Sequence, residues 1–317
     1  MSALLDIGGL AKRFDIGGKR LLHAVDNVSF TIGKGETVGL VGESGCGKST
    51  LVRLINRLLD PSDGSIALAG TDLAKIRASG FAGNPHRKRI QMVFQDAGDS
   101  LNPRFTAAQA IGDPLRRLAG LSGARLSARV EALADMTGLP RELLSRFPHQ
   151  LSGGQKARVG IARAIAVEPE LLILDEPTAA LDVSVQVVIL QLLQTLKREL
   201  GMSYLFVSHD LNVVRLLCDR VLVMYLGKIV ESGPAAEVFA DPKHPYTTAL
   251  ISAIPQAEPE KRAGRLRLGG EPRSPIDPDP RVCRFYGRCP KGEPRCSSDM
   301  PALREAGPAR EVACHFA

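Results

Sequence analysis

The sequence predicts an α/β fold whose central sheet is mostly parallel and covered by helices. Short apolar segments that suit buried strands alternate along the chain with longer segments of helical periodicity. A glycine-rich turn at residues 42–47 joins one such strand to one such helix, as in the strand–turn–helix units of parallel sheets. With 317 residues, 44% of them hydrophobic and 24% charged, the chain can build one large domain and a smaller appendage.

The first ninety residues are expected to form strands and turns around the glycine-rich turn. An apolar strand covers 36–41. A helix follows over 48–59, where apolar residues recur at helical spacing. Pro61 and Gly64 are expected to end this helix.

The middle of the chain, from about 97 to 165, has a mainly helical pattern, with candidate helices at 105–118, 124–136 and 152–167. An apolar strand then covers 171–174, and a helix covers 183–200 before Gly201, a residue type that suits a helix C-terminus. A further strand at 203–207 runs into His209. Strands that alternate with helices in this way favour parallel pairing.

Composition changes near residue 255. Six prolines lie between 255 and 280 and helical periodicity is lost, which indicates a linker or extended arm. Four of the six cysteines follow in the last segment. The sequence therefore predicts a first domain over 1–254 and a C-terminal extension over 255–317.

Composition and charge argue against several function classes. No apolar run reaches the roughly 18 residues that cross a bilayer, and the start lacks the basic and apolar regions of a signal peptide, so a cytosolic location is expected. The net charge of +7 permits contact with nucleic acid or anionic lipid. Only 4% of residues are aromatic and none is Trp, which leaves few surfaces for base stacking. Direct nucleic-acid binding is not expected, and the basic stretch at 261–267 is interpreted as a solvated tail rather than a lipid-binding patch.

The glycine-rich turn belongs to the motif Gly42-Glu-Ser-Gly-Cys-Gly-Lys-Ser-Thr50, which predicts a phosphate-binding loop. Its glycines let the backbone curl so that N–H groups point at phosphate oxygens, and the following helix adds the positive end of its dipole. Lys48 is expected to bridge the β- and γ-phosphates of ATP and Ser49 to bind Mg²⁺. Cys46 is interpreted as a loop filler rather than a reactive thiol. The predicted nucleotide contacts are Gly42, Ser44, Gly45, Cys46, Gly47, Lys48, Ser49 and Thr50.

Two acidic residues follow the predicted strand at 171–174. Asp175, at the strand tip, is expected to hold the hydration shell of Mg²⁺. Glu176 is expected to orient and deprotonate the attacking water. An acidic pair after an apolar strand is weak evidence alone, and the phosphate-binding loop makes it strong.

At this point the chain resembles the ATP-binding-cassette (ABC) family over about residues 4–254. The resemblance is carried by Leu151-Ser-Gly-Gly-Gln155, about twenty residues before Asp175-Glu176-Pro-Thr178, and then by Ala180-Leu-Asp182 and His209. It implies a P-loop NTPase fold with a mostly parallel central sheet, an antiparallel β subdomain and a helical subdomain at about 97–165. A small cysteine-containing C-terminal extension completes the expected architecture.

The Leu151–Gln155 motif can form an anion site that has no phosphate loop of its own. Ser152 can cap the following helix, and Gly153 and Gly154 expose N–H groups at its positive end. The resemblance implies that this motif, with Gln155, meets the γ-phosphate held by a partner subunit, so that two ATP molecules lie between two cassettes. It also implies that Asp182 helps to form the dimer seam.

The resemblance assigns three further positions. Phe14 lies where the family places an aromatic residue that stacks on adenine, although a core Phe is the alternative. Gln95 corresponds to the glutamine that senses Mg²⁺ and the attacking water. His209 corresponds to the histidine that contacts the γ-phosphate. Glu176, His209 and Gln95 are thus the predicted catalytic residues, and Ser49, Gln95 and Asp175 the predicted magnesium-site residues.

Several segments resemble the ATPase subunits of dipeptide, oligopeptide and nickel importers. They are Ser100-Leu-Asn-Pro-Arg104, Ala180-Leu-Asp-Val-Ser184, Tyr225-Leu-Gly227, His244-Pro-Tyr-Thr247 and the cysteine tail, and the match is nearest to the second, F-type, ATPase of dipeptide importers. This implies ATP-driven import of dipeptides or oligopeptides at the cytoplasmic face of the cell membrane. The implied partners are a second ATPase forming a heterodimer, two transmembrane permease subunits and an extracytoplasmic substrate-binding protein. The alternatives are nickel or other small-solute import, or a soluble ABC ATPase acting on ribosomes or DNA.

The four cysteines of the last segment allow three interpretations. Disulfides are not expected in a reducing cytosol. Four thiolates can hold a [4Fe–4S] cluster, as in some importer ATPases with a similar tail, or a Zn²⁺ ion, although close Cys-x2-Cys pairs are missing. The third interpretation is free thiols. The candidate ligands are Cys283, Cys289, Cys296 and Cys314.

Overall fold

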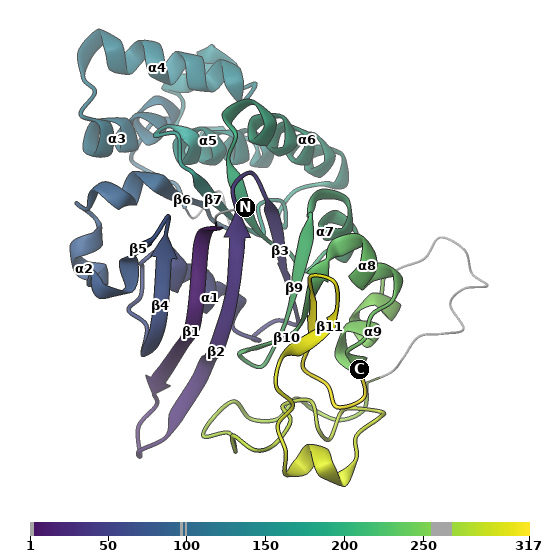
Figure 1. Cartoon of the computed structure of the whole chain (residues 1–317). Helices are drawn as coiled ribbons and strands as arrows, with labels where there is room; N and C mark the ends of the chain where they lie inside the picture. Colours follow the sequence, from purple (N-terminus) through teal and green to yellow (C-terminus); the bar gives the residue numbers. More distant parts are fainter. Residues whose placement is uncertain (1–2, 96–97, 99, 255–267) are drawn as a thin grey trace.

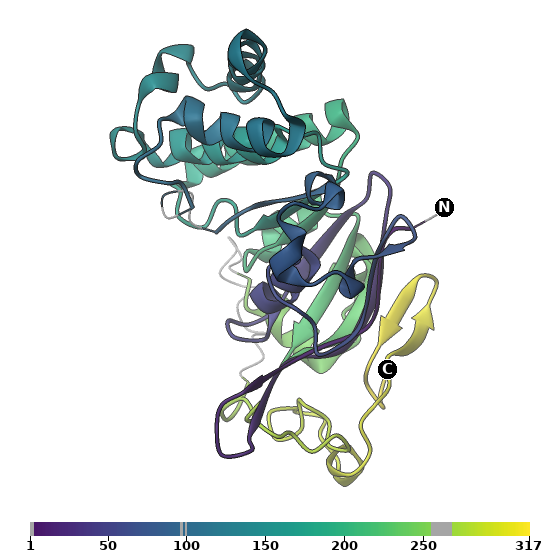
Figure 2. The same cartoon turned by 90° about the vertical axis from the view of Figure 1, so that its left-hand side faces the viewer.

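The computed structural model describes residues 3–95, 98, 100–254 and 268–317 (Figure 1). The chain forms a four-stranded sheet of order β2-β1-β4-β5 and an eight-stranded sheet of order β11-β12-β10-β9-β3-β8-β7-β6. Figure 2 shows a group of helices at one end of the molecule and the C-terminal extension at the other. The basic stretch at 261–267 lies outside the described residues, as does the first half of the predicted proline-rich arm, residues 255–267.

The four-stranded sheet is antiparallel throughout. Its strands are β1 (Ala3–Asp15), β2 (Leu21–Gly33), β4 (Asp63–Leu68) and β5 (Thr71–Asp72). Leu5, Leu10 and Ile32 are fully buried and belong to one hydrophobic cluster with Leu40 of the larger sheet and Leu51 of the first helix. This cluster ties the antiparallel sheet to the elements that flank the glycine-rich turn.

The larger sheet is parallel in its centre. Its parallel strands are β6 (Ile90–Val93), β7 (Leu171–Asp175), β8 (Ser203–Val207), β3 (Thr37–Val41) and β9 (Arg220–Tyr225). Every residue of β3, β7 and β8 is buried, as expected for parallel strands covered on both faces. The predicted α/β fold with a mostly parallel sheet is therefore confirmed.

The described part of the chain contains the five predicted α-helices, close to their expected positions, and four further ones. They are α1 (Lys48–Ile55), α2 (Ala78–Phe81), α3 (Ala107–Ala119), α4 (Gly123–Met136), α5 (Gly153–Ile165), α6 (Val183–Leu200), α7 (Leu211–Leu217), α8 (Ala235–Ala240) and α9 (Pro245–Ser252). Gly201 ends α6 in the left-handed conformation, as predicted. No helix in the described part of the chain is both long and apolar enough to span a bilayer.

The helix α1 is four residues shorter than predicted. Arg57 adopts a left-handed backbone conformation with φ of 54°, which no α-helix can continue. Its guanidinium group is buried and donates to the carboxylate of Asp60 (2.6 Å) and to the carbonyl oxygen of Leu59 (3.0 Å). The chain therefore turns at Arg57 to satisfy a buried cation, before Pro61 and Gly64 are reached.

The C-terminal extension joins the larger sheet. After β10 (Lys228–Pro234), which runs antiparallel to β9, the extension adds the hairpin of β11 (Arg304–Gly307) and β12 (Arg310–Val312). Strand β12 pairs with β10 through Glu231 and Ser232. The extension and the preceding part of the chain thus share one sheet. The boundary between 254 and 255 stays a prediction, because residues 255–267 lie outside the described ranges.

A buried ion pair fastens this hairpin to the sheet. Arg310 donates to the carboxylate of Glu231 at 2.7 Å, and the two side chains are 6% and 0% exposed. The same carboxylate accepts the backbone N–H groups of Lys243 and His244, each at 2.9 Å. His244 begins α9 by accepting the N–H of Tyr246, and burial lowers its pKa to about 3, so its ring is neutral at pH 7.

Replacing Arg310 tests how firmly the extension is attached. Arg310→Ala leaves a buried carboxylate without its cation and is expected to lower the free energy of unfolding by about 3–5 kcal/mol in urea titration. Arg281→Ala is the matched control, since Arg281 makes an exposed pair with Asp279 and its loss is expected to cost under about 1 kcal/mol. Equal effects of the two variants would contradict this account.

Candidate nucleotide-binding site

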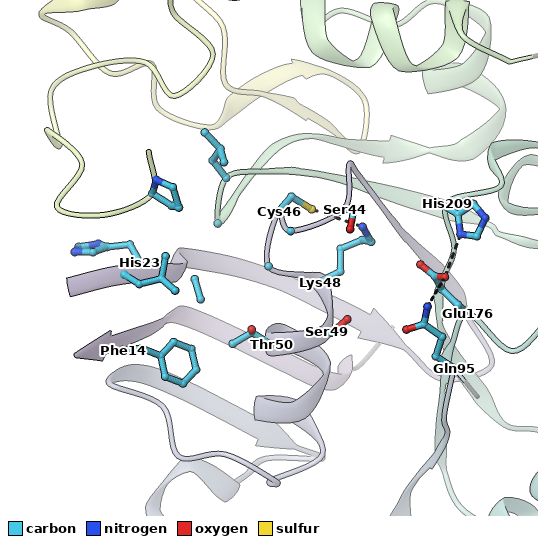
Figure 3. Close-up of a pocket in the computed structure, with 17 residues that line it drawn as sticks. Phe14, His23, Ser44, Cys46, Lys48, Ser49, Thr50, Gln95, Glu176 and His209 are labelled. Atoms are coloured by element: carbon cyan, nitrogen blue, oxygen red, sulfur yellow. Dashed lines mark hydrogen bonds and ion pairs between the residues drawn. The ribbon is translucent and has the colours of Figure 1, made fainter. Parts of the chain in front are cut away.

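The glycine-rich turn between β3 and α1 opens onto a cavity of about 430 Å³ (Figure 3). This turn and the start of α1 form the middle of the cavity, between its two ends (Figure 3). The residues of this part that line the cavity are Ser44, Gly45, Cys46, Gly47, Lys48, Ser49 and Thr50. The predicted loop residues therefore lie together, with Gly42 just behind them at the end of β3.

Two glycines of the loop, Gly42 and Gly47, pack so closely on neighbouring backbone that a side chain there would overlap it. Gly47 has φ of 109°, and a Cβ atom there would overlap the carbonyl oxygen of Ala24. A Cβ at Gly42 would overlap the carbonyl oxygen of Met224. Gly45, with φ of 78°, faces open space, where a side chain would project from the loop. The curled backbone is thus fixed from behind and open toward the cavity.

Lys48 holds the loop in this shape. Its ammonium group is buried and donates to the carbonyl oxygens of Gly42 (2.7 Å) and Glu43 (2.9 Å). The amino end of α1 begins at the same residue and adds its positive dipole. A cation, a helix N-terminus and a side-chain-free backbone suit a chain of phosphate groups, so these residues fit the triphosphate of ATP.

Cys46 and Cys218 are buried thiols. Burial raises the pKa of Cys46 and raises that of Cys218, just after α7, to about 12. Both stay protonated at neutral pH, which agrees with the interpretation of Cys46 as a loop filler.

Three side chains, those of Gln95, Glu176 and His209, meet at one end of the cavity, beyond the phosphate loop (Figure 3). The Glu176 carboxylate accepts a hydrogen bond from Gln95 Nε2 at 3.0 Å and lies 3.1 Å from His209 Nδ1. Gln95 follows β6, Glu176 follows β7 and His209 follows β8. The carboxyl ends of neighbouring parallel strands converge at one edge of the sheet, which explains how residues 114 positions apart come together.

Asp175 ends β7 beside this group. It is buried, and desolvation, with a further contribution from the Glu176 carboxylate, raises its pKa. Two neighbouring carboxylates and the Ser49 hydroxyl are oxygen donors of the kind that Mg²⁺ binds. The chemistry of the donor set therefore fits a magnesium ion at the phosphate end of the cavity.

The nucleoside end of the cavity includes residues that sequence analysis missed. Phe14, near the end of β1, is half-buried and lines the cavity with Leu22, His23, Leu226 and Pro275. Phe14 thus faces the cavity and lies outside the buried core. Its stacking on adenine stays a prediction. Leu22, His23 and Pro275 belong to no motif, and Pro275 comes from the C-terminal extension.

The Leu151–Gln155 motif lies away from this cavity. Ser152 begins α5, accepts the N–H of Gln155 at 3.3 Å and is itself bonded to the Gln155 side chain, so the predicted cap is confirmed. Added Cβ atoms at Gly153 and Gly154 would press on Leu181 and Val185, around the start of α6. Asp182 is the residue just before α6. The structure therefore packs the motif against the segment that contains Asp182, outside the chain's own cavity.

The four cysteines of the extension surround one very small cavity of about 10 Å³. All four are free thiols. Burial, together with the nearby cysteines, raises the pKa of Cys283, Cys289 and Cys314. Within the described ranges, no group of three or more His, Cys, Asp or Glu side chains is placed to hold a metal ion. The geometry does not support the predicted metal site.

Family models match two parts of the chain. The ABC transporter model matches residues 25–179, and the model of the oligopeptide/dipeptide transporter C-terminal region matches residues 230–296. A putative oligopeptide transport ATP-binding protein, YkfD of Bacillus subtilis, is 46% identical over 99% of this chain and 95% of its own length. The probable peptide ABC transporter ATP-binding protein y4tS of Sinorhizobium fredii is 46% identical over 99% of this chain and 90% of its own.

Solved structures with the same architecture are ATP-binding cassettes. The ADP- and phosphate-bound dimer of the cassette MJ0796 has a TM-score of 0.67 at 31% identity, covering 73% of this chain and 98% of that one. The cbiO1 protein of Clostridium perfringens, part of the cbiONQ ABC transporter complex, has a TM-score of 0.66 at 33% identity, covering 76% and 92%.

The fold, the phosphate loop and the group of Gln95, Glu176 and His209 at the strand ends together define a P-loop ATPase that binds ATP with Mg²⁺. The chain belongs to the ABC transporter family, as an ATP-binding cassette subunit with the C-terminal region of the oligopeptide/dipeptide transporters.

A single methyl group at the phosphate loop tests the cavity as the nucleotide site. Gly47→Ala forces the loop away from Ala24 and is expected to weaken ATP binding at least tenfold in calorimetric titration. Gly123→Ala is the matched control, because Gly123 has φ of 55° but no neighbour near its Cβ position. It is expected to cost about 1 kcal/mol of stability and leave ATP affinity unchanged. Wild-type affinity in Gly47→Ala would refute the site.

Proposed function

We propose that this chain is the ATP-hydrolysing subunit of an importer for dipeptides or oligopeptides. The single observation that carries the proposal is that one chain combines the phosphate-loop cavity with the C-terminal region of oligopeptide/dipeptide transporters. The named relatives support the peptide substrate, since they are described as peptide import or peptide transport ATP-binding proteins. Import of nickel or another small solute is the alternative.

In this proposal the phosphate loop and Lys48 bind the triphosphate. Ser49 and Asp175, with Gln95, hold Mg²⁺, which supplies positive charge that neutralises the phosphates. Phe14 packs on the adenine ring. The hydrogen bonds of Lys48 to Gly42 and Glu43 support this role, because the ammonium group is already held over the loop that would receive the phosphates.

Glu176 is proposed as the general base. Its carboxylate is fixed between Gln95 and His209, so Oε2 faces the cavity in a defined orientation and can accept a proton from water. Gln95 can orient the same water through its amide group. His209 can turn from Glu176 to the γ-phosphate. The backbone φ of 48° at Glu176 marks a strained residue of the kind found at active sites.

The second half of each ATP site is proposed to come from a partner cassette. Ser152, Gly153, Gly154 and Gln155 stand at a helix N-terminus outside the chain's own cavity, and this placement supports contact with a nucleotide held by another subunit. Next to Asp182, Val183 and Val187 of α6 are 78% and 49% exposed. We propose that this face meets a second ABC ATPase in a heterodimer.

The remaining partners are proposed from the transporter class. Two permease subunits would anchor the ATPase pair at the cytoplasmic face of the membrane, and an extracytoplasmic protein would deliver the peptide. The nucleotide-binding domain would comprise 1–254, with its helical subdomain at about 97–165, and the importer-type extension 255–317. The helices α3, α4 and α5 pack on one another at one end of the molecule, which supports a helical subdomain (Figures 1 and 2).

A [4Fe–4S] cluster on Cys283, Cys289, Cys296 and Cys314 stays a hypothesis. Their convergence on one small cavity supports it, whereas their present arrangement is not that of a ligand set. Anaerobic purification decides between the interpretations. A brown preparation with stoichiometric iron supports the cluster, bound zinc supports a zinc site, and a colourless metal-free preparation leaves four thiols.

Replacing the proposed base tests both hydrolysis and transport. Glu176→Gln is expected to lower ATP turnover at least a hundredfold while ATP still binds, because the amide cannot accept the proton of water. Uptake of labelled dipeptide by cells carrying the variant should be lost with it. Glu199→Gln, at an exposed position near the end of α6, is the matched control and should change neither.

The two readouts separate the two halves of the proposal. Undiminished hydrolysis by Glu176→Gln would refute its assignment as base. Lost hydrolysis with unchanged dipeptide uptake would refute dipeptide import, and the same pair of strains would then be compared for uptake of longer peptides and nickel.

A further inference from the structure

The C-terminal extension reaches back to the phosphate loop. Arg288 donates two hydrogen bonds to the Glu43 carboxylate, from Nη1 at 3.0 Å and from Nη2 at 3.2 Å. Nη1 also lies 3.2 Å from the hydroxyl of Tyr225. The Arg288 side chain is only 10% exposed, so solvent screens this bidentate pair weakly.

Glu43 is the loop residue next to Gly42, and it is held at three points. Its N–H donates to the hydroxyl of Tyr246 at 2.8 Å, its carbonyl oxygen accepts from Lys48 at 2.9 Å, and its carboxylate is paired with Arg288. The carbonyl oxygen of Glu43 binds the ammonium group of Lys48, which lines the cavity. A movement of Glu43 therefore also moves Lys48.

An aromatic cluster fixes Arg288 in place. The rings of Tyr225, Tyr246 and Phe285 have centroids 4.5–5.6 Å apart, and Phe285 is 1% exposed. The N–H of Arg288 donates to the carbonyl oxygen of Phe285 at 3.1 Å, and the next residue, Cys289, does so at 3.0 Å. The turn that carries Arg288 is therefore anchored in the same cluster that contacts the loop.

The extension also forms part of the nucleoside end of the cavity. The N–H of His23 donates to Pro275 (2.9 Å), and Leu21 and Asp277 exchange two hydrogen bonds of 2.9 Å. This segment, 275–277, thus pairs with the start of β2. Pro275 lines the cavity and accepts from His23, which lies with Phe14 at the opposite end from Glu176 (Figure 3).

We propose that the C-terminal extension is a working part of the ATP site. Arg288 is a positioning residue that neutralises Glu43 and holds the phosphate loop in its binding shape, and segment 275–277 forms a wall beside the nucleoside. The proposal rests on ATP binding at this cavity, as in the proposed function. It adds that the affinity for ATP depends on residues far outside the cassette motifs.

The charge of the Glu43 carboxylate predicts how the loss of Arg288 changes the affinity for ATP. Without Arg288, the phosphate loop would carry the Glu43 carboxylate with no cation paired to it, which disfavours binding of a polyanion at this loop. Among the described residues, Gln95, Glu176 and His209 make no hydrogen bond to Arg288 or to Glu43. Loss of Arg288 should therefore act on nucleotide binding and leave the chemical step largely intact.

The test uses the full chain, with Mg²⁺, and measures both the Kd of ATP and the steady-state parameters of hydrolysis. Arg288→Ala is expected to raise the Kd and the KM of ATP about tenfold and to change kcat less than twofold. Arg288→Lys should give an intermediate rise, because an ammonium group cannot form the bidentate pair. Arg281→Ala, an exposed arginine of the same extension, is the control and should match the wild type.

A double-mutant cycle isolates the charge pair. In a Glu43→Gln background there is no carboxylate to neutralise, so Arg288→Ala should raise the Kd of ATP less than threefold. An equal rise in both backgrounds would overturn the role of Arg288. If Arg288→Ala does not fold, Arg288→Lys carries the cycle, and a wild-type Kd for it would overturn the proposal in the same way.

Inorganic tripolyphosphate distinguishes the two ends of the site. Pro275→Gly should weaken ATP at least threefold and leave tripolyphosphate affinity unchanged, whereas Arg288→Ala should weaken both. Equal effects of Pro275→Gly on the two ligands would overturn the nucleoside wall. A wild-type chain that binds no ATP would refute the proposed function itself, whereas wild-type ATP binding with no effect of Arg288→Ala would refute this inference alone.

Discussion

The close approach of backbone to backbone behind the phosphate loop is the constraint on which the rest of the structure depends. Gly42 and Gly47 have no side chains because the carbonyl groups of Met224 and Ala24 occupy that space. The loop is thereby pressed between β9 and β2, and its other side lines the cavity. The antiparallel sheet, the parallel sheet and α1 must all pack correctly for this contact to exist, so the site forms only when the core does.

The same architecture explains the cluster at the other end of the cavity. Gln95, Glu176 and His209 follow three adjacent parallel strands, and the order β8-β7-β6 places them next to one another. Each strand is fully or mainly buried, so the positions of its polar end residues are determined by packing. The sheet therefore determines where Gln95, Glu176 and His209 lie, because each follows the end of its strand by only one or two residues.

Local patterns in the sequence predicted most of the architecture. The helices α3–α6 and strands β3, β7 and β8 lie within two residues of their expected bounds, since their periodicity and end signals agree. The early end of α1 at Arg57 was missed because it depends on a buried cation bonded to Asp60 and to backbone carbonyl groups. No local rule reports such a contact.

The candidate site likewise contains residues that the sequence predicted and residues that it did not. Its loop and strand-end residues were found from motifs whose spacing reflects chemistry. His23 and Pro275 were missed because they reach the cavity through strand pairing between segments some 250 residues apart, which leaves no periodic signal. The metal ligand set proposed from the four cysteines stays a hypothesis, because a shared location in the sequence does not by itself give ligand geometry.

The pairing of β12 with β10 has a consequence for the solubility of the cassette. Without the hairpin, β10 would become the sheet edge, with unpaired backbone groups and a buried, uncompensated Glu231. Such an edge is a template for pairing with other chains. The hairpin instead ends the sheet with a very short strand, β11, that carries Arg304 and Glu305 on exposed positions. The extension therefore also serves as a cover that keeps neighbouring copies from joining edge to edge.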